Sequence, residues 1–144
     1  MGTTLHAHIE VRKDGKWHHY ACPDIDRDYL VFACINGTRK DAFDDAPNSI
    51  KDKIKPVARV HELPKDMSEV TRTCLDMDKA GYRLHGFGVL EADDLSALQK
   101  ELREITGCGR YDLEADIFKT YISGNSIARH EGFDDVRVLF WFDN

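Results

Sequence analysis

Apolar and polar residues alternate strictly between Leu5 and Arg12, and a second short run from Trp17 to Cys22 follows Asp14-Gly15. Alternation places successive side chains on opposite faces of a strand. Asp-Gly is a preferred two-residue turn between such strands because both positions tolerate positive φ. The pattern therefore predicts a β-hairpin in which Lys13 lies opposite Lys16 and Arg12 lies opposite Trp17.

The predicted register gives one face of this hairpin an unusual polar character. With Asp14-Gly15 as the turn, Glu10 lies opposite His19, and His8 lies opposite Ala21. The side chains on this face are His6, His8, Glu10, Arg12, Trp17 and His19. Such a face suits solvent, but it also suits a metal site, an acid–base site or a small-ligand site.

A first helix is predicted after the hairpin. Apolar residues between Tyr29 and Ile35 indicate the helix, with Asp26 as its N-cap and Asn36-Gly37 as its end. Residues 38–60 are polar and weakly periodic, so we expect a long polar loop with at most one short helical turn around Ile50 to Ile54. Loops of this length in small domains are often functional.

Two longer helices are predicted in the middle of the chain. The first has Asp66 as its N-cap and ends at Gly81. Its apolar residues recur at helical spacing and predict a core-facing stripe of Met67, Val70, Cys74 and Met77. The second runs from about Asp93 to Thr106, and the acidic residues at its start suit the helix dipole.

Further strands are expected near residues 82–90, 117–122 and 136–142. The last of these is bulky or apolar on both faces, which is typical of a central strand. The element order predicts an α+β fold in one globular domain over residues 1–144, with a mostly antiparallel sheet and about three helices packed on one face. The polar hairpin face would then point away from the helices.

Composition and charge exclude several classes of protein. Hydrophobic residues make up 42% and charged residues 32% of the chain, which is typical of a globular protein. The net charge of −6 disfavours extended contact with nucleic-acid phosphates. The longest apolar run, Val138 to Phe142, is far shorter than the roughly 20 residues of a membrane span. Without a signal-peptide pattern we expect a cytoplasmic location and reduced cysteines.

One candidate site is a metal centre on the polar hairpin face. His8, Glu10 and His19 lie close enough on adjacent strands to share one divalent ion such as zinc. They would support a metal-dependent hydrolase or nuclease. However, the chain has no H-E-x-x-H or C-x-x-C motif. The first expectation is therefore that no metal or other cofactor is bound.

A second candidate site binds a small anion. The turn at residues 123–126, followed by Arg129 and His130, offers backbone N–H groups, hydroxyls and cationic side chains. An ordinary turn has the same composition, so both interpretations remain open. Arginines would pair with a phosphate and aromatic rings would stack on a base. The predicted ligand-binding residues are Trp17, Arg83, Tyr121, Asn125, Ser126, Arg129, His130, Arg137 and Trp141.

Several segments resemble small uncharacterised proteins encoded in phages and prophages. These segments are Tyr121 to Ile127, His130 to Arg137, Phe140 to Asn144 and the opening His6 to Val11. The resemblance implies no activity and no site residues. It does imply that the protein acts on a host without chemistry, by sequestering a nucleotide immune signal, blocking a host protein or assembling with phage components.

The first hypothesis is therefore a non-enzymatic, homo-oligomeric accessory protein that captures a small anionic ligand, such as a nucleotide immune signal. The second is a metal-dependent hydrolase or nuclease that uses His8, Glu10 and His19. The third is a protein-binding inhibitor or structural module that docks a partner through the aromatic face of the sheet.

Overall fold

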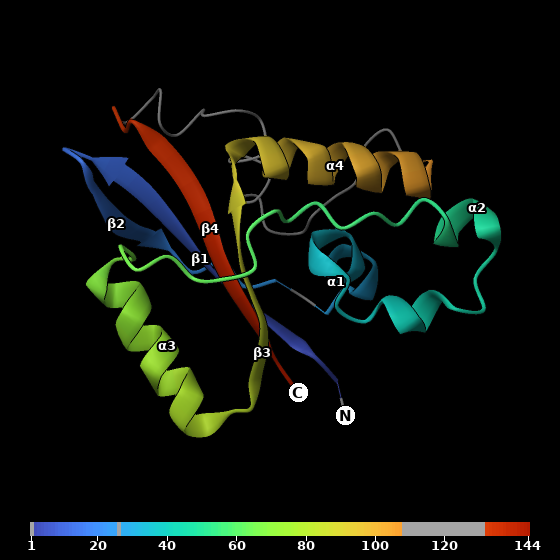
Figure 1. Cartoon of the computed structure of the whole chain (residues 1–144), viewed down its shortest axis with the longest axis horizontal. Coiled ribbons are helices and arrows are strands. Elements are labelled where there is room, and N and C mark those ends of the chain that lie inside the picture. The colour runs from blue at the N-terminus through green and yellow to red at the C-terminus, as the bar shows by residue number, and fades with distance from the viewer. Residues whose placement is uncertain (1, 26, 108–131) are drawn as a thin grey trace.

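The computed structural model describes residues 2–25, 27–107 and 132–144 (Figure 1). Within these residues, four strands form one antiparallel sheet in the order β2-β1-β4-β3. The strands are β1 (Thr4–Lys13), β2 (Lys16–Ala21), β3 (Leu84–Glu91) and β4 (Asp135–Asp143). The predicted α+β class and the central position of β4 are confirmed. The strand predicted near residues 117–122 lies outside the described residues.

The helical elements are α1 (Tyr29–Asn36), η1 (Lys40–Phe43), α2 (Asn48–Lys51), α3 (Glu69–Gly81) and α4 (Ala92–Thr106). Asp28, rather than Asp26, caps α1 by accepting hydrogen bonds from the N–H groups of Leu30 and Val31. The predicted end of α1 is confirmed, because Gly37 has a φ of 86°. None of the described helices has the length and hydrophobicity required to cross a membrane.

The hairpin of β1 and β2 confirms the predicted turn. Asp14 and Gly15 have φ values of 53° and 76°, as a primed turn requires. The predicted register holds as far as Glu10 opposite His19. A β-bulge then shifts it, so that Ala21 lies opposite Ile9 rather than His8.

One face of the sheet carries the hydrophobic core. Alternate residues of β1 and β4 on this face are buried against α1 and α4. The ring centroids of Phe32 in α1 and Phe142 in β4, for example, lie 5.1 Å apart. Figure 1 shows α1 and α4 on one side of the sheet and α3 on the other. The expectation that all helices share one face is therefore wrong for α3.

The predicted core-facing stripe of α3 is also wrong. Val70 is 52% exposed and Met77 is 69% exposed, whereas Thr71 and Leu75 are buried. The helix begins after Ser68, whose side chain accepts a hydrogen bond from the N–H of Thr71, and not after Asp66. The sheet face beneath α3 carries both polar and large apolar residues, and α3 is bound to it by hydrogen bonds from the Thr71 hydroxyl to Glu10 and from the Trp141 indole N–H to Asp78.

The segment between α1 and α3 is less irregular than predicted. It contains η1 and α2 instead of a single turn at Ile50 to Ile54. Further along, Val60 forms an isolated antiparallel β-bridge with Val89 of β3. The N–H of Val89 donates to the carbonyl of Val60 at 3.1 Å. This approach requires a glycine beside it, because a Cβ on Gly88 would lie 2.8 Å from the Val60 carbonyl oxygen.

Candidate functional site

A buried ion pair lies at the centre of the sheet face under α3. Glu10 is fully buried and Arg137 is 7% exposed. Glu10 Oε1 accepts from Arg137 Nε at 3.0 Å and from Nη2 at 2.8 Å. Glu10 Oε2 accepts from the Ser68 N–H and from the Thr71 hydroxyl, both at 2.8 Å. The carboxylate thus joins β1, β4 and the start of α3.

These hydrogen bonds also determine the ionisation of Glu10. Burial of the carboxylate opposes ionisation, but the donors from Ser68, Thr71 and Arg137 together hold the pKa of Glu10 below its ordinary value. Glu10 is therefore an ionised structural anchor for α3. Because each carboxylate oxygen already accepts two hydrogen bonds, Glu10 does not point a lone pair toward His8 or His19.

Arg137 and Trp17 form a fixed pair beside this anchor. The guanidinium carbon lies 3.9 Å from the centroid of the Trp17 ring, which is a close cation–π contact. Arg137 Nη1 donates to Asp66 Oδ1 at 3.1 Å. The arginine is thus held by Glu10, Asp66 and Trp17, and its position is set before any ligand arrives.

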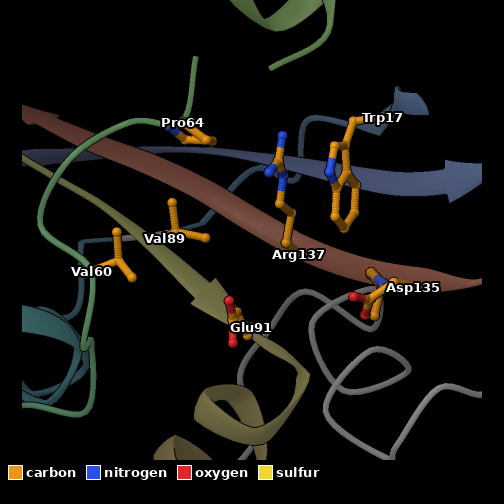
Figure 2. Close-up of a pocket in the computed structure, with 8 residues that line it drawn as sticks. Trp17, Val60, Pro64, Val89, Glu91, Asp135 and Arg137 are labelled. Carbon is orange, nitrogen blue, oxygen red and sulfur yellow. The ribbon is translucent and has the colours of Figure 1, made fainter. Parts of the chain in front are cut away.

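A cavity of about 180 Å³ opens next to this pair (Figure 2). Its lining residues are Trp17, Val60, Pro64, Val89, Glu91, Asp135, Val136 and Arg137. Figure 2 shows Val60 and Pro64 on the segment that precedes α3, and Val89 and Glu91 on β3. We call this cavity the Trp17 pocket. It combines apolar walls with one guanidinium and two carboxylates, a composition typical of small-ligand sites.

The charge of the Trp17 pocket is not favourable to anions. The positive charge of Arg137 is already matched by Glu10 and Asp66. Glu91 accepts a backbone N–H bond from the first turn of α4, and Asp135 Oδ1 accepts from the N–H of Val136 at 2.8 Å. Each of these carboxylates keeps lone pairs beyond the one in that bond. Among the described lining residues, the carboxylates of Glu91 and Asp135 therefore outnumber the one guanidinium.

The histidines of the polar face form a separate cluster. His8 is 3% exposed, its ring stacks on Trp141 with centroids 4.8 Å apart, and its Nδ1 lies 3.1 Å from His19 Nε2. Burial and the neighbouring His19 lower the pKa of His8 to about 4. Burial also lowers the pKa of His19. Both rings are therefore neutral at pH 7.

The residues of the metal hypothesis are not assembled around one point. His8 and His19 contact each other, but Glu10 bonds to Arg137, Ser68 and Thr71. Among the described residues, no group of three His, Cys, Asp or Glu side chains is placed to hold a metal ion. A divalent metal at His8, Glu10 and His19 would require Glu10 to leave its hydrogen bonds.

Of the four predicted ligand-binding residues that the structure describes, Trp17 and Arg137 are brought together. Trp141 is fully buried and donates its indole N–H to Asp78 at 2.9 Å, so its ring faces no ligand. Arg83 lies next to Leu84, at the opposite end of β3 from Glu91, which pairs with Arg137. The other predicted residues lie outside the described part of the chain: Tyr121, Asn125, Ser126, Arg129 and His130.

The remaining walls of the pocket were not predicted from sequence patterns. Val60 and Pro64 come from the segment around the end of the predicted polar loop, and their approach to β3 depends on pairing between distant segments. The sequence does contain one weak indication that Glu91 lies near Arg137. Glu91 directly follows the predicted 82–90 strand, and in the observed antiparallel register it lies opposite Arg137.

The fold and the pocket together define an α+β sheet protein with a small cavity beside Trp17 and Arg137. Comparisons with protein-family models, curated proteins and solved structures gave no match to this chain. The function is therefore argued from the residues of the cavity.

Proposed function

We propose that this protein is a non-enzymatic binding protein that holds a small ligand in the Trp17 pocket. One observation carries the proposal: the cavity lies against an aromatic ring and a guanidinium that are already fixed to each other. A site ordered before binding loses little conformational entropy when the ligand arrives. Among the described residues, the lining side chains include no serine, cysteine or histidine, so this part of the pocket supports binding better than nucleophilic chemistry.

The size of the cavity limits the ligand. A volume of about 180 Å³ corresponds to roughly six water molecules at the density of the liquid. It lies below the range of about 300–1,000 Å³ that is usual for drug-sized ligands. We therefore propose a compact ligand, and a nucleotide would place only part of its structure in this pocket.

The charge of the cavity selects among compact ligands. Glu91 and Asp135 favour a ligand that carries a positive charge or hydrogen-bond donors, while Val60, Pro64 and Val89 favour an apolar body. A phosphate would approach both carboxylates and gain little from Arg137, which is neutralised by Glu10. The proposal thus keeps the ligand-binding role expected from the sequence but shifts the preferred ligand from an anion to a small organic cation.

Capture of such a ligand without turnover agrees with the accessory role that the resemblance to phage proteins implies. In that setting the protein would lower the free concentration of a host metabolite or signal. Homo-oligomerisation remains a prediction, and the described cavity is formed by one chain.

Filling the pocket is expected to abolish binding. Val60 lines the cavity and is 42% exposed, so Val60→Trp places a large ring in the cavity with little cost to the core. We expect fragments that shift the Trp17 indole N–H resonance in a nuclear magnetic resonance screen to lose this effect in Val60→Trp.

Val70→Trp is the matched control. Val70 is also an exposed valine, but it lies on α3 and does not line the cavity. Fragment binding should persist in this variant. Equal binding to both variants would show that the ligand site lies elsewhere.

A further inference from the structure

A cysteine and a buried histidine face each other near the end of β2. Cys22 directly follows β2 and is exposed, whereas His8 lies in β1 and is 3% exposed. Cys22 Sγ lies 4.0 Å from His8 Nε2. Neither residue lines the Trp17 pocket. The pair therefore joins a thiol that solvent can reach to a protected ring nitrogen, outside the ligand site proposed above.

The His8 ring is held with Nε2 toward the cysteine sulfur. Its Nδ1 lies 3.1 Å from His19 Nε2, and its ring stacks on Trp141. Because both imidazoles are neutral at pH 7, one ring donates a proton to the other in this bond. When His8 donates from Nδ1, its Nε2 has a lone pair directed at Cys22. Histidines that bind metals commonly have this arrangement, in which the second ring nitrogen donates to an acceptor that fixes the ring.

The pair is not arranged as a catalytic thiolate. Burial raises the pKa of the Cys22 thiol, and the nearby Cys74 and Asp78 raise it further. Burial also lowers the pKa of His8 to about 4. A reactive thiolate beside an imidazolium requires a lowered thiol pKa instead. The two groups are therefore neutral, and together they offer one sulfur donor and one nitrogen donor.

The separation of these two donor atoms fits one metal ion between them. The bond lengths of zinc, about 2.3 Å to sulfur and about 2.0 Å to imidazole nitrogen, are a guide for a first-row ion. With these lengths the donors would lie about 3.5 Å apart at a tetrahedral angle and about 4.3 Å apart on a straight line. The observed 4.0 Å lies between these values, so an ion would be held at an angle wider than tetrahedral.

The number and type of the donors select among metals. Among the described residues, no third His, Cys, Asp or Glu is placed to complete a metal site. Zinc sites use three or four protein ligands, whereas monovalent copper is stable with two and prefers thiolate sulfur. We propose that Cys22 and His8 bind one monovalent copper ion, with His19 as the acceptor that orients His8. On binding, the S–H bond of Cys22 breaks, the sulfur bonds to the ion, and the proton passes to solvent.

The test is a titration with Cu(I), kept reduced by ascorbate in the absence of oxygen, against a competing Cu(I) chelator. The indole N–H resonance of Trp141, whose ring stacks on His8, reports binding, and the Trp17 indole resonance is the reference. We expect a shift at Trp141 that saturates at one ion per chain, and no shift at Trp17. Zn(II) should give no saturable shift. A saturable zinc shift that is lost in Cys22→Ser would contradict the assignment to copper.

Three variants locate the site. Cys22→Ser changes an exposed residue and should leave the fold intact. It should weaken Cu(I) binding more than about a hundredfold, because loss of an outer partner of a ligand alone costs about 10–100-fold. His8→Gln should weaken binding as strongly. Cys74→Ser is the matched control at a second free cysteine and should bind as the unchanged protein does. Unchanged affinity in Cys22→Ser, or equal losses in Cys22→Ser and Cys74→Ser, would overturn the proposal.

Discussion

Replacing Glu10 with alanine is expected to lower the free energy of unfolding by about 3–5 kcal/mol. The substitution leaves the guanidinium of Arg137 buried without its main partner, and it also removes the acceptor of Ser68 and Thr71. Breaking one side of a buried ion pair costs far more than the pair itself contributes. Urea denaturation at pH 7 measures the change.

Asp66→Ala is the matched control for this prediction. Asp66 also pairs with Arg137, at 3.1 Å, but its side chain is 66% exposed. Exposed ion pairs contribute about 0–1 kcal/mol, so the expected loss stays within that range. If both substitutions cost the same, Glu10 is not the anchor of α3.

Between pH 7 and pH 5, the titration of His8 is expected to contribute a loss of about 2 kcal/mol in the free energy of unfolding. The pKa of His8 is lowered to about 4 in the folded state, from 6.5. As the pH falls below 6.5, the unfolded chain binds a proton that the folded protein does not. Stability therefore decreases until the pH reaches the folded pKa.

The measurement compares urea denaturation at pH 7 and pH 5 for the unchanged protein and for His8→Gln. The pH-dependent loss should be about 2 kcal/mol smaller in His8→Gln. His18→Gln, at an exposed histidine of β2, should keep the full loss. Glu10 does not confound the comparison, because its lowered pKa means that its contribution is lost only below about pH 4.5. Identical pH dependence in both variants would contradict the burial of a neutral His8.

Local signals were sufficient to predict much of the fold. The Asp14-Gly15 turn, the end of α1 at Gly37 and the central position of β4 each depend on residues close together in the sequence. The orientation of α3 was not predictable in this way. The apolar stripe at Met67 and Met77 favoured a core helix, but α3 covers the sheet face that carries the Glu10–Arg137 ion pair and turns Thr71 toward Glu10.

The residues of the candidate site were likewise predictable only where local patterns position them. The hairpin register correctly placed Trp17 on the polar face, and the predicted alternation placed Arg137 on a face of the last strand. Glu10 pairs with Arg137, which is 127 residues away, and with Ser68 at the start of α3, which is 58 residues away. No local sequence pattern encodes these contacts. Glu10, one of the three residues that suggested a metal site, is therefore half of a structural ion pair.

We propose above all that the Trp17 pocket binds a compact ligand that carries a positive charge. The most direct measurement is a titration with benzylamine, benzyl alcohol and benzoate, which share one ring and differ in charge. The two tryptophans give two indole N–H resonances, Trp17 in the pocket and Trp141 buried under α3 as an internal reference. We expect benzylamine to shift the Trp17 resonance most and benzoate least, with Trp141 unchanged. A larger shift with benzoate, or no shift with any probe, would contradict it.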